Sequence, residues 1–185
     1  MKARFLHDPY GTHQPVLYEA VMRTSGPVVE FGIGYNSTPW LHKLCDGRKL
    51  LSAETDIRWL LAFLHFASPG QHRFVLVKNL DALLRDIMAV PWSVAFVDQG
   101  AWDDRVATVM ALKDKARFIV LHDCDYFVTH SLLEFDELFK YHKEFLPLEP
   151  WPYPRTGPPT LLASNFEDCN WDIDYEKYKG MECFA

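Results

Sequence analysis

Short apolar runs recur along the chain at nearly even intervals, and each has about the length of one β-strand. These runs occupy residues 28–31, 49–54, 73–78, 93–98 and 117–122. Their apolar character is nearly continuous rather than alternating, which is typical of strands that are covered on both faces. The pattern therefore predicts five buried strands.

The segments between these runs have the length and the apolar spacing of short helices. The predicted helices cover residues 38–44, 57–66, 80–88 and 103–113. Strands that alternate with helices at this spacing indicate βαβ units, right-handed crossovers and a parallel sheet. The predicted fold class is therefore α/β.

The last third of the chain departs from this alternation. Residues 127–140 predict one amphipathic helix, and residues 143–148 and 159–164 predict two further strands. The proline-rich residues 149–158 exclude a helix interior or a central strand, so we expect a stiff connection there. A polyproline ligand for another protein is the alternative, although the segment has no clean PxxP pattern.

Length and composition favour one globular domain. The chain has 185 residues, of which 49% are hydrophobic and 24% are charged, and this balance excludes a disordered protein. We expect a single domain in which residues 1–27 form a cover and residues 28–166 the core. Residues 167–185 are acidic and aromatic and predict a solvated, partly ordered tail, or alternatively an oligomer contact.

Net charge and cysteine spacing limit the expected binding partners and cellular compartment of the protein. The formal net charge is −6, which argues against broad, salt-driven binding to nucleic acid. No apolar run approaches the roughly 20 residues of a membrane helix, and the first residues lack the apolar stretch of a secretory signal. The four cysteines show no metal-like spacing. These features together predict a cytoplasmic protein.

The clearest local motif follows the first apolar run, where Glu30 precedes Gly32 and Gly34, and Ser37 stands at a helix start. Ligands of open parallel sheets bind beyond the carboxyl ends of the strands, and glycine lets them approach the backbone closely. A dinucleotide site would need a third glycine at position 37 and no carboxylate at position 30. Glu30 therefore suits a cationic ligand or a hydroxyl, or alternatively accepts hydrogen bonds from its own loop.

Polar residues also end the fourth and fifth runs. Asp98 ends one, and His122 and Asp123 end the other, so a doubly wound sheet would bring them to one edge. The two carboxylates would suit Mg²⁺, with Asp125 as a third ligand. Alternatively His122 is a general base oriented by a carboxylate. In a third interpretation His122 is a satisfied core residue, and Asp123 caps the next helix.

Residues 30–34, Glu-Phe-Gly-Ile-Gly, resemble the E/D-x-G-x-G motif of class I S-adenosylmethionine-dependent methyltransferases. Residues 94–98 resemble the "vfvDg" segment of that family, and residues 119–123 its "vvvHD" ending. The last two predicted strands are similar to the reversed hairpin that closes the family's sheet. The resemblance spans residues 14–166 and implies a three-layer αβα sandwich with a doubly wound, mostly parallel seven-stranded sheet.

The resemblance also implies S-adenosylmethionine as cofactor. It places Glu54 on the ribose hydroxyls, and Asn79 and Asp81 near the adenine. Glu54 and Asp81 have alternative roles as helix caps, although Asp56 is the better cap for the helix that follows Glu54. The cofactor-binding residues implied by the resemblance are Glu30, Gly32, Ile33, Gly34, Ser37, Glu54, Thr55, Asn79, Asp81 and Asp98.

The expected activity is O-methyl transfer to a small or medium-sized acceptor, with His122, Asp123 and Asp98 as catalytic residues. Similarity to metal-assisted O-methyltransferases adds Asp98 and Asp123 as ligands of Mg²⁺ or another divalent cation. The alternatives are a non-catalytic nucleoside-binding or scaffold protein and an NAD-dependent oxidoreductase. The expected partner is the small-molecule acceptor, with no membrane and no broad nucleic-acid surface. A homodimer is left open as an alternative to a monomer.

Overall fold

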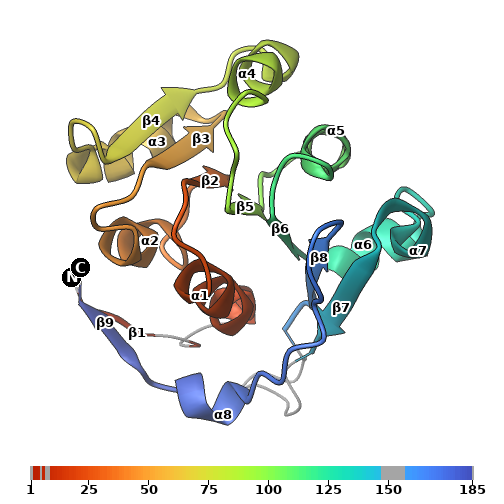
Figure 1. Cartoon of the computed structure of the whole chain (residues 1–185). Helices are drawn as coiled ribbons and strands as arrows, with labels where there is room; N and C mark the ends of the chain where they lie inside the picture. Colours follow the sequence, from red (N-terminus) through yellow and green to blue (C-terminus); the bar gives the residue numbers. More distant parts are fainter. Residues whose placement is uncertain (1, 5, 7–8, 147–156, 185) are drawn as a thin grey trace.

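The computed structural model describes residues 2–4, 6, 9–146 and 157–184. Seven strands form the central sheet in the order β4-β3-β2-β5-β6-β8-β7, with helices on both faces (Figure 1). Strands β2 to β6 run parallel, whereas β8 is antiparallel to both β6 and β7. The predicted α/β class and the seven-stranded sheet are therefore confirmed. The strands are β2 (Val28–Phe31), β3 (Leu50–Glu54), β4 (His72–Leu76), β5 (Val94–Val97), β6 (Phe118–His122), β7 (Tyr141–Phe145) and β8 (Thr160–Ser164).

The order of the strands reverses between β2 and β5. The chain winds from β2 through β3 to β4 on one side, and then returns to build β5 and β6 on the other. The space beyond the carboxyl ends of β2 and β5 is therefore the usual position of a ligand in such a sheet. The crossover helices are α2 (Thr38–Leu44), α3 (Ile57–Phe63), α4 (Leu80–Ile87) and α5 (Trp102–Leu112).

Two apolar layers cover the sheet and explain why its strands have continuous apolar runs. One layer packs residues such as Val29 and Val97 against α4 and α5. The other packs Val28 and Phe96 against α2 and against α1 (Gln14–Met22). All residues of β2 and β5 are buried, because side chains pointing to either face of the sheet meet a helix layer.

Two of the predicted helices are shorter in the structure. Residues 127–140 do not form one helix, because α6 (Cys124–Thr129) and α7 (Phe135–Leu138) are separated by a turn at Ser131, whose φ is +50°. Leu133, which follows this turn, is buried in the core. Helix α3 likewise ends early and continues as the 3₁₀ helix η2 (Leu64–Phe66).

The C-terminal segment has mainly exposed side chains over residues 167–181, as its charge suggests, but it also forms short elements and is anchored at two buried positions. It contains α8 (Tyr175–Tyr178) and β9 (Glu182–Phe184), and β9 pairs antiparallel with β1 (Lys2–Arg4). Cys169 and Tyr178 are buried against the layer that contains α1. These two residues therefore anchor the segment to the rest of the fold. Residues 147–156, which include most of the predicted proline-rich connection at 149–158, lie outside the described residues.

None of the helices in the described part of the chain is long and apolar enough to cross a bilayer.

Gly32 marks the tightest backbone crossing at the ligand edge of the sheet. Its φ is +91°, and a Cβ atom added there would lie 2.4 Å from the carbonyl oxygen of Asp98. Gly47 is a matched control, because its φ is +75° but a Cβ atom would meet nothing within 4 Å. We expect Gly47→Ala to destabilise by about 1–2 kcal/mol from conformation alone, and Gly32→Ala by about 3 kcal/mol or more.

Urea unfolding of the two variants measures this difference directly. Equal losses of stability would show that the backbone after β5 moves away from the loop at no cost.

Candidate functional site

The carboxyl ends of four parallel strands meet along one edge of the sheet, which we call the rim. We define the rim by Gly32 to Gly34 after β2, Glu54 at the end of β3, Asp98 after β5, and His122 with Asp123 at the end of β6. The parallel register of these strands places the groups side by side. The sequence-based expectation that Asp98, His122 and Asp123 share one edge is met.

The glycine loop is held from both sides. The backbone N–H of Ile33 donates to Oε2 of Glu54 at 3.0 Å, and that of Gly34 donates to Oγ1 of Thr38 at 3.0 Å. Oε1 of Glu54 also accepts from the backbone N–H groups of Thr55 and Asp56. Glu54 thus fastens the end of β3 to the loop while its side chain stays partly exposed.

Glu30 lies beneath the rim rather than on it. It is fully buried, and its carboxylate accepts hydrogen bonds from the hydroxyls of Thr38 at 3.0 Å and Ser52 at 2.5 Å, with Ser37 also contributing. Burial raises the pKa of Glu30 to about 7, and these hydroxyls oppose that rise. The structure therefore gives Glu30 a role in holding the loop onto α2 and does not bring it to the surface of the rim.

Arg105 of α5 lies at the centre of the rim cluster and is 5% exposed. Its guanidinium donates to the backbone oxygens of Gln99 and His122 and forms ion pairs with Asp98 at 3.0 Å and Asp123 at 3.1 Å. The guanidinium bridges these two carboxylates, so a metal ion held by Asp98 and Asp123 together would have to displace it, and that expectation stays a prediction. Asp125, the suggested third ligand, is exposed on α6.

His122 connects this cluster to the N-terminal segment. Its ring is 2% exposed, with Nδ1 lying 3.2 Å from Oδ1 of Asp98 and Nε2 lying 3.0 Å from Oγ1 of Thr12. Burial alone would raise the pKa of Asp98, but the hydrogen bond and charge of His122, with the charge of Arg105, hold it below its ordinary value. Asp98 is thus an ionised carboxylate with 26% of its side chain exposed.

Asp123 occupies the N-cap position of α6 with φ +54°, and its side chain forms no capping hydrogen bond. Its carboxylate turns to Arg105 instead, which differs from the capping role that the sequence allowed. A left-handed aspartate stores strain, and such strain persists where surrounding contacts fix the residue.

His13 is the residue that precedes α1, and it is buried below the rim. Its ring centroid lies 4.6 Å from those of His122 and Phe96. Burial lowers the pKa of His13 to about 3, so the ring is neutral at pH 7. Its Nε2 lies 3.2 Å from the backbone oxygen of Asn36, and Nδ1 has no hydrogen-bond partner among the described residues.

Sequence reasoning missed three members of the cluster, namely Arg105, Thr12 and His13. Arg105 had a signal, because it shares the buried stripe of α5 with Val109 and Leu112 at the spacing i, i+4, i+7. A charged residue on a core-facing stripe predicts a buried partner. Thr12 and His13 have no such periodic signal.

The remaining predicted residues follow the ends of β2, β3 and β4, and Asn79 and Asp81 are the two that follow β4. Asn79 caps α4 by accepting from the N–H of Ala82 at 2.9 Å, and Asp81 lies exposed in the first turn of that helix. The cap is therefore Asn79 rather than Asp81. Asp56 caps α3, as the sequence predicted. Ser37 occupies the N-cap position of α2, and Thr55 is exposed after β3.

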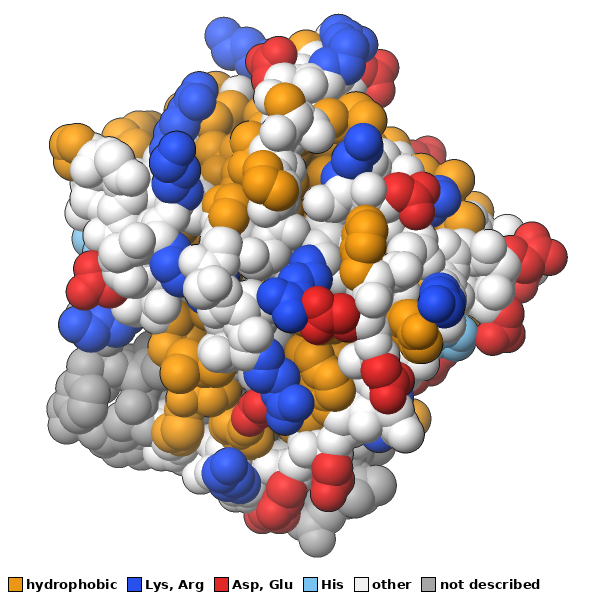
Figure 2. All heavy atoms as spheres, viewed as in Figure 1, with side chains coloured by type: hydrophobic (Ala, Val, Ile, Leu, Met, Phe, Trp, Pro, Cys, Tyr) orange, Lys and Arg blue, Asp and Glu red, His pale blue; other side chains and the backbone are white. Residues whose placement is uncertain are grey.

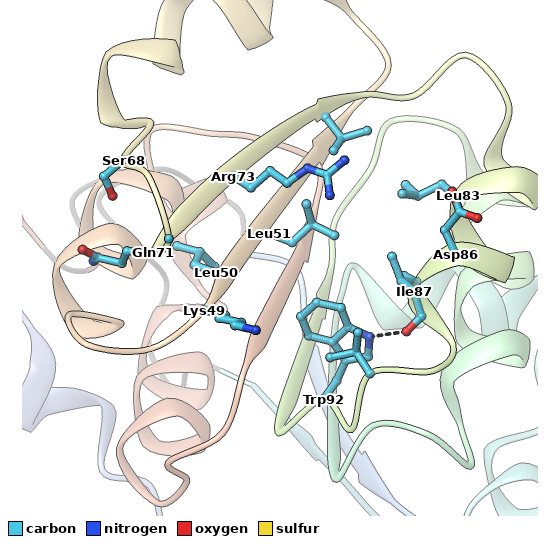
Figure 3. A pocket seen from close by; sticks show the side chains of 13 residues that line it. Lys49, Leu50, Leu51, Ser68, Gln71, Arg73, Leu83, Asp86, Ile87 and Trp92 are labelled. Carbon is cyan, nitrogen blue, oxygen red and sulfur yellow. Dashed lines mark hydrogen bonds between the residues drawn. The ribbon is translucent and has the colours of Figure 1, made fainter.

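A separate hollow of about 380 Å³ lies at the opposite end of the sheet, between the first residues of β3 and β4 and helix α4 (Figure 3). The side chains of Lys49, Arg73 and Trp92 border it. The hollow shares no residue with the rim, so the two are different places on the molecule.

Acidic and basic side chains are interspersed over the face shown in Figure 2, and no broad basic area covers that face. The absence of broad nucleic-acid binding stays a prediction from the net charge.

Comparison with solved structures finds similar folds among methyltransferases. Human methyltransferase-like protein 13 in complex with SAH has a TM-score of 0.58 and 14% identity, over 91% of this chain and 85% of that one. Cofactor-bound Rv0187 from MTB has a TM-score of 0.57 and 13% identity, over 84% and 80%. A putative caffeoyl-CoA O-methyltransferase from Staphylococcus aureus has a TM-score of 0.51 and 13% identity, over 82% of each chain.

The chain spans only 40% of the bifunctional kinase-methyltransferase WbdD, which it matches with a TM-score of 0.54. No protein-family model matches the sequence, and no curated protein matches it. Similarity at identities this low shows a shared fold. The chemistry has to be inferred from the residues of the site.

Arg105 is the first target for substitution. Arg105→Met would leave two carboxylates without their cation and two backbone oxygens without a donor, so we expect a loss of about 2–4 kcal/mol. Arg85→Met, on the exposed side of α4, is the control and should change stability by less than about 0.5 kcal/mol. Urea unfolding gives both values, and similar small losses would contradict the central role of Arg105.

The buried carboxyl of Glu30 should make the stability of the protein depend on pH. The pKa of Glu30 rises from 4.5 to about 7 on folding. Its contribution to the free energy of unfolding is therefore fully present below about pH 4.5 and is lost as the pH rises towards 7. Relative to Glu30→Gln, the free energy of unfolding of the wild type should fall by on the order of 3 kcal/mol between about pH 4 and about pH 8.

Unfolding at a series of pH values measures the stability difference between the two proteins. Exposed Glu137→Gln is the control and should show no such trend. A wild-type minus Glu30→Gln difference that is constant with pH would contradict the burial argument.

Proposed function

We propose that this chain, which has the class I methyltransferase fold, is an S-adenosylmethionine-dependent methyltransferase that acts on an oxygen of a small or medium-sized acceptor. The observation that supports this most is the glycine loop at the strand-order reversal, flanked by the carboxylates of Glu54 and Asp98. Solved neighbours of this fold include a SAH complex and a cofactor-bound structure.

The rim fits a cationic nucleoside better than a dinucleotide. S-adenosylmethionine supplies a methyl group on a positively charged sulfur. Partly exposed carboxylates of Glu54, Asp98 and Asp123 outnumber the single guanidinium of Arg105, which favours a cation. The start of α2 already faces the buried carboxylate of Glu30, so the pyrophosphate of a dinucleotide would be repelled there.

Gly34 leaves space beside the backbone in which the cofactor can lie. A Cβ atom at that position would meet only Oγ of Ser37, at 3.9 Å, so a ligand can lie against the loop. In our proposal Glu54 accepts hydrogen bonds from ribose hydroxyls while its other contacts keep the loop in place. Asn79 and Asp81, at the end of the neighbouring strand, are then nearest to the adenine.

Asp98 is the member of the cluster that is best placed to meet the acceptor. It is the partly exposed partner of the buried His122, whose Nδ1 lies 3.2 Å from Oδ1 of Asp98, and the ion pair with Arg105 fixes its orientation. In our proposal Asp98 takes the proton of the acceptor hydroxyl as the methyl group arrives. His122 and Asp123 then act as positioning residues, which hold Asp98 and Arg105.

One observation favours a second candidate, a non-catalytic protein that binds the nucleoside. The polar groups of the rim satisfy one another through Arg105, as they would in a purely structural network. Nucleoside binding without methyl transfer to any hydroxyl acceptor would support this second candidate. The NAD-dependent oxidoreductase is disfavoured by the serine at position 37 and by the buried Glu30.

Calorimetry with S-adenosylmethionine, S-adenosylhomocysteine and NAD tests cofactor choice. We expect both sulfur nucleosides to bind with one site and NAD not to bind. Glu54→Ala should weaken nucleoside binding by about tenfold or more, because two charge-assisted hydrogen bonds are lost. Glu137→Ala, exposed and far from the rim in sequence, should bind normally. No binding of either sulfur nucleoside would overturn the proposal.

Transfer of a labelled methyl group to a panel of hydroxylated and amine acceptors tests the reaction. Asp98→Asn should lower turnover by about 100-fold, the usual scale of a lost general base. Its affinity for S-adenosylhomocysteine should stay within about threefold of wild type. An unchanged turnover in Asp98→Asn would contradict the role given to this carboxylate, and transfer only to amines would contradict the choice of oxygen.

A further inference from the structure

Three side chains from separate parts of the chain converge below the rim. They are His13 before α1, Asp98 after β5 and His122 at the end of β6, and their potential ligand atoms all lie within 4.8 Å of one another. His13 and His122 are 1% and 2% exposed. Two histidines and one carboxylate form a set that binds metal ions in many proteins.

The hydrogen bonds around His122 show that a positive charge belongs beside its Nδ1 atom. Oγ1 of Thr12 lies 2.6 Å from the backbone oxygen of Pro158 and donates its single proton there. The same Oγ1 must then accept from Nε2 of His122, at 3.0 Å. A neutral His122 therefore turns the lone pair of Nδ1 towards Oδ1 of Asp98, 3.2 Å away. Two lone pairs repel each other unless a proton or a metal ion lies between them.

His13 lies beside these two residues, since its ring centroid is 4.6 Å from that of His122. Its Nε2 donates to the backbone oxygen of Asn36 at 3.2 Å, so in the neutral ring Nδ1 carries no proton. Nδ1 is buried and has no hydrogen-bond partner among the described residues. A buried acceptor without a partner is costly, and a bound cation would remove that cost.

With His122 neutral, the charges of the cluster leave one carboxylate uncompensated. Asp98 and Asp123 carry two negative charges, and Arg105 supplies one positive charge to them. Arg105 approaches Asp98 as a hydrogen-bond donor, which is a common way for a protein to orient a ligand carboxylate. A divalent cation beside Asp98 therefore meets both free lone pairs and a net negative charge.

We propose that His13 Nδ1, His122 Nδ1 and Asp98 bind one divalent transition-metal ion such as Zn²⁺ or Co²⁺. Two nitrogens and one oxygen suit these ions better than Mg²⁺, which prefers oxygen. The 3.2 Å between Nδ1 of His122 and Oδ1 of Asp98 also fits. Adjacent ligands with bonds of about 2.0–2.1 Å are about 3.0–3.4 Å apart around such an ion.

The ion would add chemistry to the proposed methyl transfer, and only this part rests on that proposed function. A set of three protein ligands leaves positions open on the metal, as in catalytic sites. An acceptor oxygen bound there would lose its proton more readily. Metal binding itself does not depend on the cofactor.

Titration of the chelator-treated full chain with Co²⁺ tests the site. We expect one ion per chain by calorimetry and visible absorption bands from bound Co²⁺, with Zn²⁺ competing and Mg²⁺ binding far more weakly. His13→Gln and His122→Gln should each lower Co²⁺ affinity by about 100-fold or more. His130→Gln, which is exposed on the surface, is the matched control and should bind as wild type does.

A second measurement covers the case in which a buried variant does not fold. In wild-type protein with labelled histidine, Zn²⁺ should shift the ring-nitrogen signals of two of the eight histidines. No saturable binding of Co²⁺ or Zn²⁺, shifts at other histidines, or binding that survives both substitutions in folded protein would overturn the proposal. The space beside Nδ1 would then hold a proton.

Calorimetry with S-adenosylhomocysteine on the same protein separates the two proposals. Metal binding without nucleoside binding would overturn the proposed function and support the metal site. Nucleoside binding without metal binding would overturn the metal site alone.

Discussion

The geometry of the rim depends on the buried guanidinium of Arg105. Adjacent parallel strands β5 and β6 are each followed by a carboxylate, and two such groups side by side repel each other away from bulk water. Arg105 resolves this by pairing with Asp98 and Asp123 and by binding the backbone at Gln99 and His122. The ring of Trp102 covers the guanidinium carbon at 4.5 Å, which limits its contact with water. One side chain of α5 therefore fixes both strand ends.

Two glutamates at neighbouring strand ends have different tasks because they point to different surroundings. Glu30 lies on the same face of β2 as Val28, so its side chain enters the layer beneath α2 and meets hydroxyl groups. Glu54 ends β3 and stays partly exposed, so it can hold the glycine loop and still meet a ligand. The loop is thus fixed from below by Glu30 through Thr38, and from the side by Glu54.

The fold was predictable because continuous apolar runs leave few alternatives to buried parallel strands. Asp98, His122 and Asp123 were predictable for a related reason, since neighbouring strands must end at the same edge. A motif does not tell which face of the sheet a side chain occupies. The sequence therefore did not reveal that Glu30 is buried. Thr12 and His13 lie far from the rim in sequence, so only tertiary packing brings them there. The aromatic anchoring of the C-terminal segment was hidden by its charge.

Strands β1 and β9 pair with each other although they lie far apart in the sequence, and we call these two strands together with α8 the belt (Figure 1). Within this belt, the hydroxyl of Tyr175 donates to the backbone oxygen of Thr12 at 3.1 Å. An N-terminal arm tethered at one end only would have to lose much conformational freedom each time it covered β6. The belt removes that freedom once, during folding, so Thr12 and His13 are delivered to the strand ends already ordered.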